Sequence, residues 1–300
     1  MAAKITVATA PCSWGVWYAD GKPSGIPWQV FLDGAAQAGY EALELGPDGY
    51  LPKDNNVLLS KLNSRKMNVC AGTACIQLEK YRSINEIKND IESLCSRVAA
   101  LNASYLVVMD ESDVGTYSEK KASIDNNAWK KYFTFVMELS KWTIDRFNIQ
   151  TVFHPHVKTL IETEKEIINM LDFYDIMLCF DTGHHAYVNG GCEYDDGAAL
   201  DFIKKFSSRI AYLHFKNVDG AVRKKVMEEK LSSDMAFDLD VMCDLSKGII
   251  DFNKLKQILD DIHYRGIGVI EMDMPGALAE VAFKAARRNL IFLKNIRMIP

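Results

Sequence analysis

Eight short apolar segments recur along the chain, and amphipathic stretches with helical spacing separate most of them. Apolar runs of about four to eight residues are typical of strands that are buried on both faces, as in a parallel sheet. Strands that alternate with helices in this way predict an α/β fold, a single (β/α)8 TIM barrel with eight parallel strands. The expected strands are residues 5–8, 40–45, 67–74, 105–109, 151–154, 177–180, 210–214 and 268–271.

Several of the intervening helices have recognisable ends. Pro27 and Gly39 suit the start and the end of the first helix, because proline fits a first helical turn and glycine accepts a left-handed backbone. Ser83 with Glu86, and Thr163 with Glu166, have the spacing of capping boxes. Further helices are expected over residues 128–147, over residues 196–206 and from about residue 251, whereas the polar residues 112–127 predict a loop.

One segment departs from this alternation. Residues 217–248, after the seventh expected strand, are too long and too charged for a simple turn. Connections of that length are often functional, such as a lid or wall over a site, although a surface helical excursion fits the sequence equally well. We expect residues 1–300 to form a single domain that carries this excursion.

Charge and composition narrow the range of partners. The chain has 300 residues, is 48% hydrophobic and carries a net charge of −5, so it has no basic field to hold a phosphate backbone. No segment approaches the roughly 20 apolar residues that a membrane span requires. The seven cysteines are scattered without CxxC spacing. We therefore expect a reduced, cytoplasmic protein that acts on a small molecule, without nucleic acid or membrane partners; association into a homo-oligomer stays open.

Chemistry-bearing side chains stand at the carboxyl ends of most expected strands. In a barrel these ends converge on one face, where such enzymes place their active sites. Five of the six histidines fall at these positions, counting His185 beside His184. The residues are Glu44 near the end of the second strand, Asp110 and Glu111 after the fourth, His154 at the end of the fifth and His156 just beyond it, Asp181 and His184 after the sixth, His214 at the end of the seventh and Lys216 just beyond it, and Glu271 at the end of the eighth and Asp273 just beyond it.

Four of these residues, from consecutive strands, form a candidate metal site. His154, Asp181, His214 and Glu271 offer mixed nitrogen and oxygen ligands, which suit Mn²⁺, Fe²⁺, Co²⁺ or Zn²⁺ better than Ca²⁺ or Mg²⁺. The absence of cysteine among them argues against a structural zinc site. Each residue also has a structural explanation: His154 as a satisfied core histidine, and Asp181 as a helix cap. The four together favour a metal.

Six segments, in order along nearly the whole chain, carry a resemblance to a known family. They are residues 44–52 (ELGPDGYLP), 153–159 (FHPHVKT), 180–187 (FDTGHHAY), 214–218 (HFKNV), 248–252 (GIIDF) and 269–271 (VIE). The chain resembles the xylose-isomerase-like barrels, a superfamily of sugar isomerases and epimerases, and within it the myo-inosose-2 dehydratases of inositol catabolism. The Asp-Thr-Gly-His and His-x-Lys motifs are shared across the superfamily, whereas residues 44–52 and the His-x-His motif are more specific to the dehydratase branch.

The resemblance implies a divalent metal, Mn, Co, Fe or Zn, at the ends of strands five to eight. Relatives usually have a glutamate at the end of strand five, where this chain has His154; Glu162 in the following loop is the alternative first ligand. Residues 245–248 and residues 272–275 also depart from the family pattern, on the side of the barrel where the substrate is expected.

The reaction expected from this resemblance is dehydration of a keto-polyol such as 2-keto-myo-inositol by a metal-dependent lyase, through an enediolate. Glu271 is the candidate base or metal ligand, His184 or His156 the candidate general acid, and Lys216 a point charge for a substrate oxygen. The residues expected to bind substrate are Trp14, Glu44, Asp110 and Lys216.

Other functions share parts of this constellation. A metal-dependent ketose 3-epimerase or sugar isomerase would use the same metal and enediolate but would return the proton without eliminating water. A barrel endonuclease is disfavoured by the acidic charge and the lack of a basic stripe. A non-catalytic sugar-binding barrel would need neither a metal nor a base, although fold alone never proves chemistry.

Overall fold

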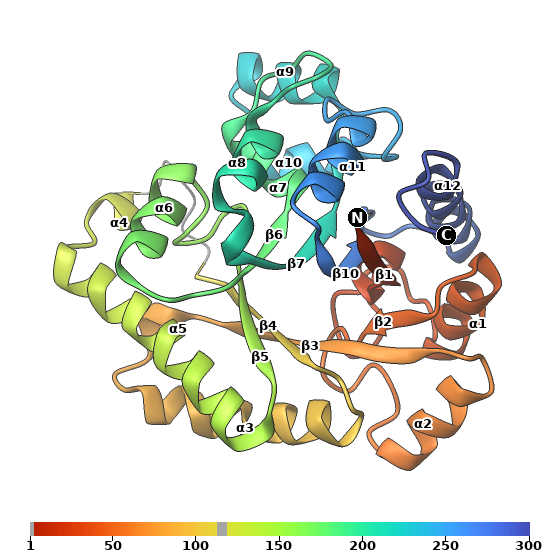
Figure 1. The fold of residues 1–300 in the computed structure, drawn as a ribbon, viewed down its shortest axis with the longest axis horizontal. Coiled ribbons are helices and arrows are strands. Elements are labelled where there is room, and N and C mark those ends of the chain that lie inside the picture. The colour runs from red at the N-terminus through yellow and green to blue at the C-terminus, as the bar shows by residue number, and fades with distance from the viewer. Residues whose placement is uncertain (1–2, 113–118) are drawn as a thin grey trace.

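Eight parallel strands close into a barrel at the centre of the molecule (Figure 1). The structure is a computed structural model that describes residues 3–112 and 119–300. The strands follow the order β1-β10-β7-β6-β5-β4-β3-β2 around the barrel, which confirms the predicted α/β barrel. They are β1 (Lys4–Thr9), β2 (Ala42–Glu44), β3 (Asn68–Ile76), β4 (Tyr105–Asp110), β5 (Gln150–His154), β6 (Leu178–Asp181), β7 (Ile210–Phe215) and β10 (Arg265–Ile270).

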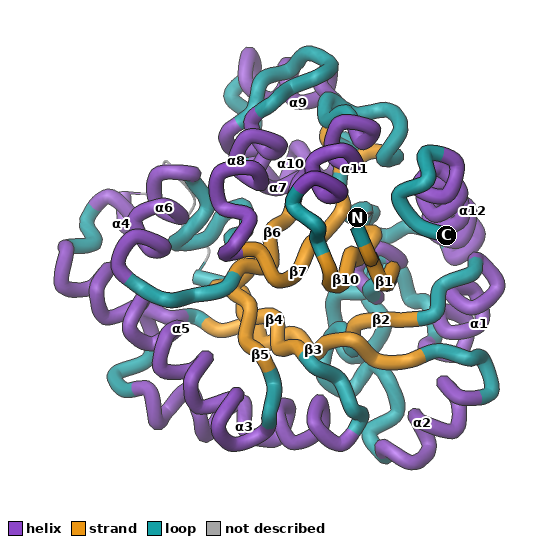
Figure 2. The backbone as a smooth tube through the Cα atoms, in the orientation of Figure 1, coloured by secondary structure: helices purple, strands orange, loops and turns teal. Residues whose placement is uncertain are grey.

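Helices surround the barrel on the outside (Figure 2). Those expected from the sequence are α1 (Trp28–Ala38), α3 (Ile84–Ala100), α5 (Asn126–Phe147), α6 (Glu164–Phe173), α8 (Ala198–Phe206) and α11 (Phe252–Asp261). Two more were not expected, α2 (Asn55–Asn63) and α12 (Ala279–Asn295). A third, α7 (Thr182–Asn189), begins after Asp181, where the sequence left a helix cap as one alternative. Of the predicted loop 112–127, residues 113–118 lie outside the described residues, and the short helix α4 (Glu119–Ala122) follows them.

The helix ends confirm some of the predicted capping residues and contradict one. Gly39 caps α1 with a left-handed backbone, φ 106°. Thr163 and Glu166 form a complete capping box at the start of α6. The box expected at Ser83 is wrong, because the Ser83 side chain makes no capping hydrogen bond to α3. Glu86 instead accepts from the backbone amide of Arg82 at 2.9 Å.

The long segment after β7 is built mostly from short helices. It contains β8 (Asn217–Val218), α9 (Gly220–Glu229), α10 (Ser233–Asp238) and β9 (Met242–Cys243), with β8 and β9 pairing antiparallel. Asp234 of α10 forms an ion pair with Lys158, 2.9 Å between Nζ and Oδ2, which ties the segment to the loop after β5. Phe237 of α10 packs edge-on against His184, with ring centroids 6.2 Å apart. The segment therefore forms a wall beside the carboxyl ends of β5 and β6.

Small side chains fill most of the barrel interior. Alanine, valine and cysteine from the strands leave room for Tyr212, whose ring packs edge-on against Tyr105 with centroids 5.1 Å apart. The interior cluster is Ala8, Ala10, Ala42, Cys70, Ala71, Val107, Val152, Cys179, Tyr212 and Val269. None of the helices within the described residues is long and apolar enough to cross a membrane.

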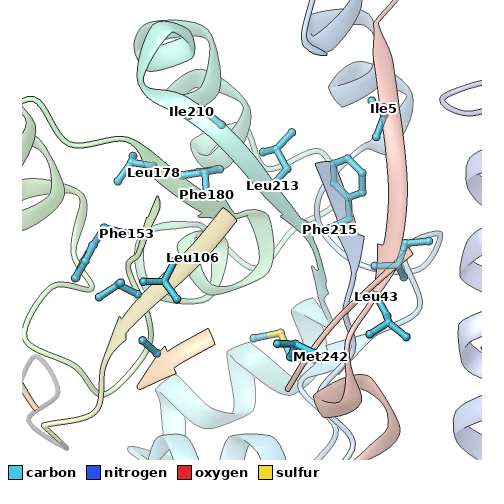
Figure 3. Close-up of a cluster of buried hydrophobic side chains, with 14 of the residues drawn as sticks. Ile5, Leu43, Leu106, Phe153, Leu178, Phe180, Ile210, Leu213, Phe215 and Met242 are labelled. Carbon is cyan, nitrogen blue, oxygen red and sulfur yellow. The ribbon is translucent and has the colours of Figure 1, made fainter. Parts of the chain in front are cut away.

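The larger side chains point outward, toward the helices. Figure 3 shows Phe153, Phe180, Leu213 and Phe215 among the buried hydrophobic side chains of this outer layer. Neighbouring side chains on a strand face opposite sides of a sheet. A strand that directs Phe180 outward must therefore direct the next residue, Asp181, into the barrel.

We expect Phe180→Ala to lower the free energy of unfolding by about 3–5 kcal/mol, because it leaves a cavity between β6 and α8. Phe180 is 1% exposed and stacks on Phe202 with ring centroids 4.9 Å apart. Phe173→Ala is the matched control, since Phe173 is 74% exposed. Urea denaturation of both variants gives the comparison, and equal losses of stability would contradict this packing account.

Candidate active site

Seven ionisable side chains gather at the carboxyl-terminal face of the barrel. Each comes from the end of a strand or the residues just after it, and each is 8% exposed or less. They are Glu44 of β2, His154 of β5, Asp181 of β6, His214 of β7, Lys216 just after β7, and Glu271 and Asp273 after β10.

Asp181 serves both as a helix cap and as a member of this cluster. Its Oδ1 accepts from the amides of Gly183 and His184 at 2.8 and 2.9 Å, which caps α7. Its Oδ2 is buried without a hydrogen-bond partner among the described residues. Burial alone raises the pKa of Asp181, but Lys216 and His214 outweigh it and lower the pKa to about 2.

Imidazole nitrogens and one ammonium surround this free oxygen. The distances from Asp181 Oδ2 are 3.4 Å to Lys216 Nζ, 3.6 Å to His214 Nδ1, 3.8 Å to His184 Nε2 and 3.9 Å to His154 Nε2. Asp181 is therefore an anion that faces four nitrogen groups.

His214 lies between carboxylates from two other strands. Its Nε2 is 3.1 Å from Glu44 Oε1, and its Nδ1 is 3.2 Å from Glu271 Oε2. Burial lowers the pKa of His214, but Cys179, Glu271 and Glu44 outweigh that effect and raise it well above its usual value. A metal ion would compete with that proton for Nδ1, because ligand nitrogens bind metals in their unprotonated form.

The Lys216 ammonium joins two carboxylates and an imidazole. Its Nζ is 2.9 Å from Asp273 Oδ2 and 3.0 Å from Glu271 Oε2, and it donates to His184 Nε2 at 2.9 Å. Burial lowers the pKa of Lys216, but the neighbouring carboxylates raise it well above its usual value. A Cβ at position 183 would lie 2.4 Å from Lys216 Cβ, so Gly183 allows α7 to begin directly over this lysine.

Three imidazoles form the side of the cluster next to β5 and α7. The ring centroids of His154, His156 and His184 are 3.9–5.6 Å apart. Burial lowers the pKa of all three, and neighbouring cationic groups lower it further. These histidines are therefore neutral at pH 7, the form that binds metals and accepts protons.

The donor set fits a divalent metal. Asp181 Oδ2, His214 Nδ1 and His154 Nδ1 are buried polar atoms without hydrogen-bond partners among the described residues, an arrangement that suits a bound ion. Three carboxylates of the cluster face the Lys216 ammonium and the fourth, Glu44, faces His214, so the carboxylates outnumber the cationic groups beside them. The ligand atoms of Glu44, His214 and Glu271 lie within 4.8 Å of one another, as do those of His154, His156 and His184.

Three residues expected at the site have other contacts. Asp110 accepts backbone amides of Leu78 and Leu160 at 3.1 and 3.0 Å, which joins the loops after β3 and β5. The Trp14 ring packs edge-on against Phe31 of α1, with centroids 5.5 Å apart, and no described contact brings it to the cluster.

The third is Glu162. Its Oε1 lies 3.2 Å from the buried Lys121 ammonium, and its Oε2 accepts from the amide of Lys158 at 2.7 Å. Glu162 also lines a small cavity together with Asp181, His184 and His185. It therefore lies near the cluster, but its carboxylate is engaged with the Lys121 ammonium of α4 and the backbone amide of Lys158.

Sequence reasoning missed two contributors. Tyr212 donates to Glu44 Oε1 at 2.8 Å, and the two-residue strand period could have placed it on the same face as His214. The Cys12 thiol donates to Glu271 Oε1 at 3.3 Å from the loop after β1, and no sequence signal marks that contact.

Comparison with known proteins agrees with this architecture. A family model, the xylose isomerase-like TIM barrel, matches residues 32–296. An inosose dehydratase of Yersinia enterocolitica is 28% identical over 297 residues, covering 95% of this chain and 96% of its own length. An inosose dehydratase of Clostridium beijerinckii is 25% identical over 264 residues, covering 84% of this chain and 85% of its own.

Two solved structures share the fold at lower identity. The probable 3-DHS dehydratase AsbF of Bacillus anthracis has a TM-score of 0.72 and 15% identity, covering 97% of this chain and 99% of its own. The IolI protein, whose structure contains a zinc atom, has a TM-score of 0.70 and 14% identity, covering 96% and 98%. The family match spans most of the chain, and the chain therefore belongs to the xylose isomerase-like TIM barrel family.

Proposed function

We propose that the protein is a metal-dependent carbon–oxygen lyase that dehydrates a keto-polyol such as 2-keto-myo-inositol through an enediolate. The observation that carries this proposal is the Lys216 ammonium, which contacts a candidate base, Glu271, and a candidate acid, His184, at 3.0 and 2.9 Å. The relatives named inosose dehydratase, 24–28% identical over most of the chain, support the substrate class. A cytoplasmic location goes with this proposal.

The proposed metal ligands are Asp181, His214 and Glu271, with His154 as the fourth and Glu162 as its alternative. A divalent ion at these residues, Mn, Co, Fe or Zn, would polarise the substrate ketone and stabilise the negative charge of the enediolate. The mixed nitrogen and oxygen donors and the unpartnered oxygen of Asp181 support this assignment.

Glu271 is the proposed base. Burial raises its pKa, but His214 and Lys216 outweigh burial and hold the pKa well below its usual value. Glu271 is therefore a carboxylate at pH 7, the form that can remove a proton from the carbon next to the ketone. Its other oxygen, Oε1, accepts from the Cys12 thiol at 3.3 Å, which helps to fix the carboxylate plane.

His184 is the proposed general acid, with His156 as the alternative because the two ring centroids lie only 3.9 Å apart. His184 is neutral at rest, and Lys216 donates to its Nε2. Lys216 keeps its proton and holds the His184 ring in place. An imidazolium form of His184, protonated from solvent, can protonate the leaving hydroxyl, since an imidazolium with a lowered pKa is a strong acid. Glu271 then releases to solvent the proton that it removed from carbon, so the step as a whole eliminates one water.

A ketose 3-epimerase or sugar isomerase is the second candidate. An acid and a base on either side of one ammonium can also return a proton to carbon without elimination. Solved proteins of the same fold include a 3-keto-D-glucoside 4-epimerase of E. coli, at 12% identity. The product, and not the site geometry, distinguishes the two reactions.

We expect Asp181→Asn and His214→Ala each to lose metal and activity while keeping the fold, because each removes a charged or nitrogen ligand from a buried site. Elemental analysis after reconstitution and far-UV circular dichroism test this. His263→Asn is the control, since His263 is exposed. Full metal occupancy in either site variant would overturn the ligand assignment.

We expect His184→Gln to lower kcat by about 10²–10⁴-fold, because it removes the general acid. His185→Gln is the matched control: the adjacent histidine faces Phe180 and Phe202, with ring centroids 5.0 Å apart in both cases, and its loss should leave most of the activity. Rates are measured on metal-loaded protein. An equal loss of kcat in both variants would contradict the role of His184.

We expect the metal-loaded protein to convert 2-keto-myo-inositol into a dehydrated product. Proton NMR in D₂O would detect that product by its vinylic or diketo signals. Loss of a carbon-bound hydrogen to solvent without those signals would favour an epimerase instead. Neither change, from protein with full metal occupancy, would overturn the proposed substrate.

A further inference from the structure

Glu44 enters the barrel at an irregularity between β2 and β3. Leu43 pairs with Val69 but Glu44 pairs with Ala71, so Cys70 is an extra residue on β3. Such bulges re-aim nearby side chains and are frequent next to active sites. The Glu44 carboxylate, one of the seven side chains of the cluster, is 3% exposed.

Side chains of the barrel interior hold this carboxylate. Tyr212 donates to Glu44 Oε1 at 2.8 Å, and His214 Nε2 lies 3.1 Å from the same oxygen. Thr73 donates to Oε2 at 3.4 Å. The Cys70 thiol, 3.3 Å from the Tyr212 hydroxyl, packs behind that hydroxyl. Both carboxylate oxygens are therefore engaged from within the barrel.

These contacts distinguish the two ring nitrogens of His214 by the carboxylates that they face. A carboxylate oxygen only accepts hydrogen bonds, so the nitrogen facing Glu44, Nε2, must be the donor. The opposite nitrogen, Nδ1, faces Glu271 Oε2 at 3.2 Å and Asp181 Oδ2 at 3.6 Å. A cation held by those two carboxylates would therefore meet Nδ1, and it would bind there by displacing the proton that Nδ1 carries in the absence of metal.

We infer that Glu44 is a positioning residue for His214: it holds the ring with Nε2–H directed down into the barrel and Nδ1 directed at the metal-binding carboxylates. This inference rests on the proposed metal site and goes beyond the ligand set. It also gives Glu44 a role other than the substrate contact expected from the sequence. Carboxylates that accept the second N–H of a ligating histidine fix its orientation and raise its basicity.

Glu44→Gln tests the inference, because the amide keeps the shape of the side chain but removes its charge. It also replaces one of the two carboxylate oxygens with an NH₂ group, which donates hydrogen bonds and does not accept them. We expect the Kd for Zn²⁺, measured by competition with a chromophoric chelator, to rise by about 10–100-fold. Thr73→Val is the matched control: it removes the Oε2 contact and leaves His214 bound to Glu44. Its Kd for Zn²⁺ should stay within about threefold of the parent.

Nitrogen-15 NMR of the histidine rings provides a readout that a purely structural role would not change. In the parent protein loaded with Zn²⁺, His214 should show a protonated Nε2 and a metal-bound Nδ1. In Glu44→Gln the Nε2–H signal of His214 should weaken, because its hydrogen exchanges faster with solvent. A parent spectrum with metal on Nε2 of His214 overturns the inference without any variant.

Two further results separate this inference from the proposed function. Unchanged Zn²⁺ affinity in Glu44→Gln with a raised KM would make Glu44 a substrate contact and overturn the positioning role. Zn²⁺ bound through Nδ1 and weakened in Glu44→Gln, in a parent protein that fails to dehydrate 2-keto-myo-inositol, would keep the positioning role and reject the dehydratase. A parent protein that binds no Zn²⁺ rejects both the metal site and the role of Glu44.

Discussion

The burial of negative charge around one lysine organises this site. Asp181, Glu271 and Asp273 all face the Lys216 ammonium within 3.4 Å, and none of them is more than 8% exposed. Isolated buried carboxylates are costly, so the arrangement requires further positive charge or bound protons. His214, held between Glu44 and Glu271, supplies one proton in the absence of metal. A divalent ion would supply more positive charge at the same place, and the repulsion among the buried carboxylates would then favour its binding.

The two-residue period of the strands produces both this cluster and the hydrophobic layer outside it. Phe180 packs outward on Phe202 while Asp181, the next residue, faces inward. Because this period is written in the sequence, the barrel and the inward residues at the ends of β5, β6, β7 and β10 were predictable. The same period could have placed Tyr212 on this face, although its contact with Glu44 depends on the register shift between β2 and β3, which the sequence does not reveal.

Other features depended on contacts between distant segments and were not predictable in this way. Asp110 ends its strand like the site carboxylates, yet amides of Leu78 and Leu160 occupy it. Trp14 lies in the loop after β1, two residues from Cys12, which contacts Glu271. Its ring nevertheless packs against α1, where Gly34 leaves space for it. The sequence left open whether Asp181 caps a helix or belongs to the site. In the structure it does both, because Oδ1 caps α7 and Oδ2 faces the cluster.

The most direct test is elemental analysis of the purified protein before and after chelation, together with turnover of 2-keto-myo-inositol. The account predicts about one equivalent of Mn, Co, Fe or Zn per chain, activity that disappears with the chelated metal, and recovery of both on reconstitution. Turnover that persists in metal-free protein, or the failure of reconstituted protein to retain any metal, would contradict the account.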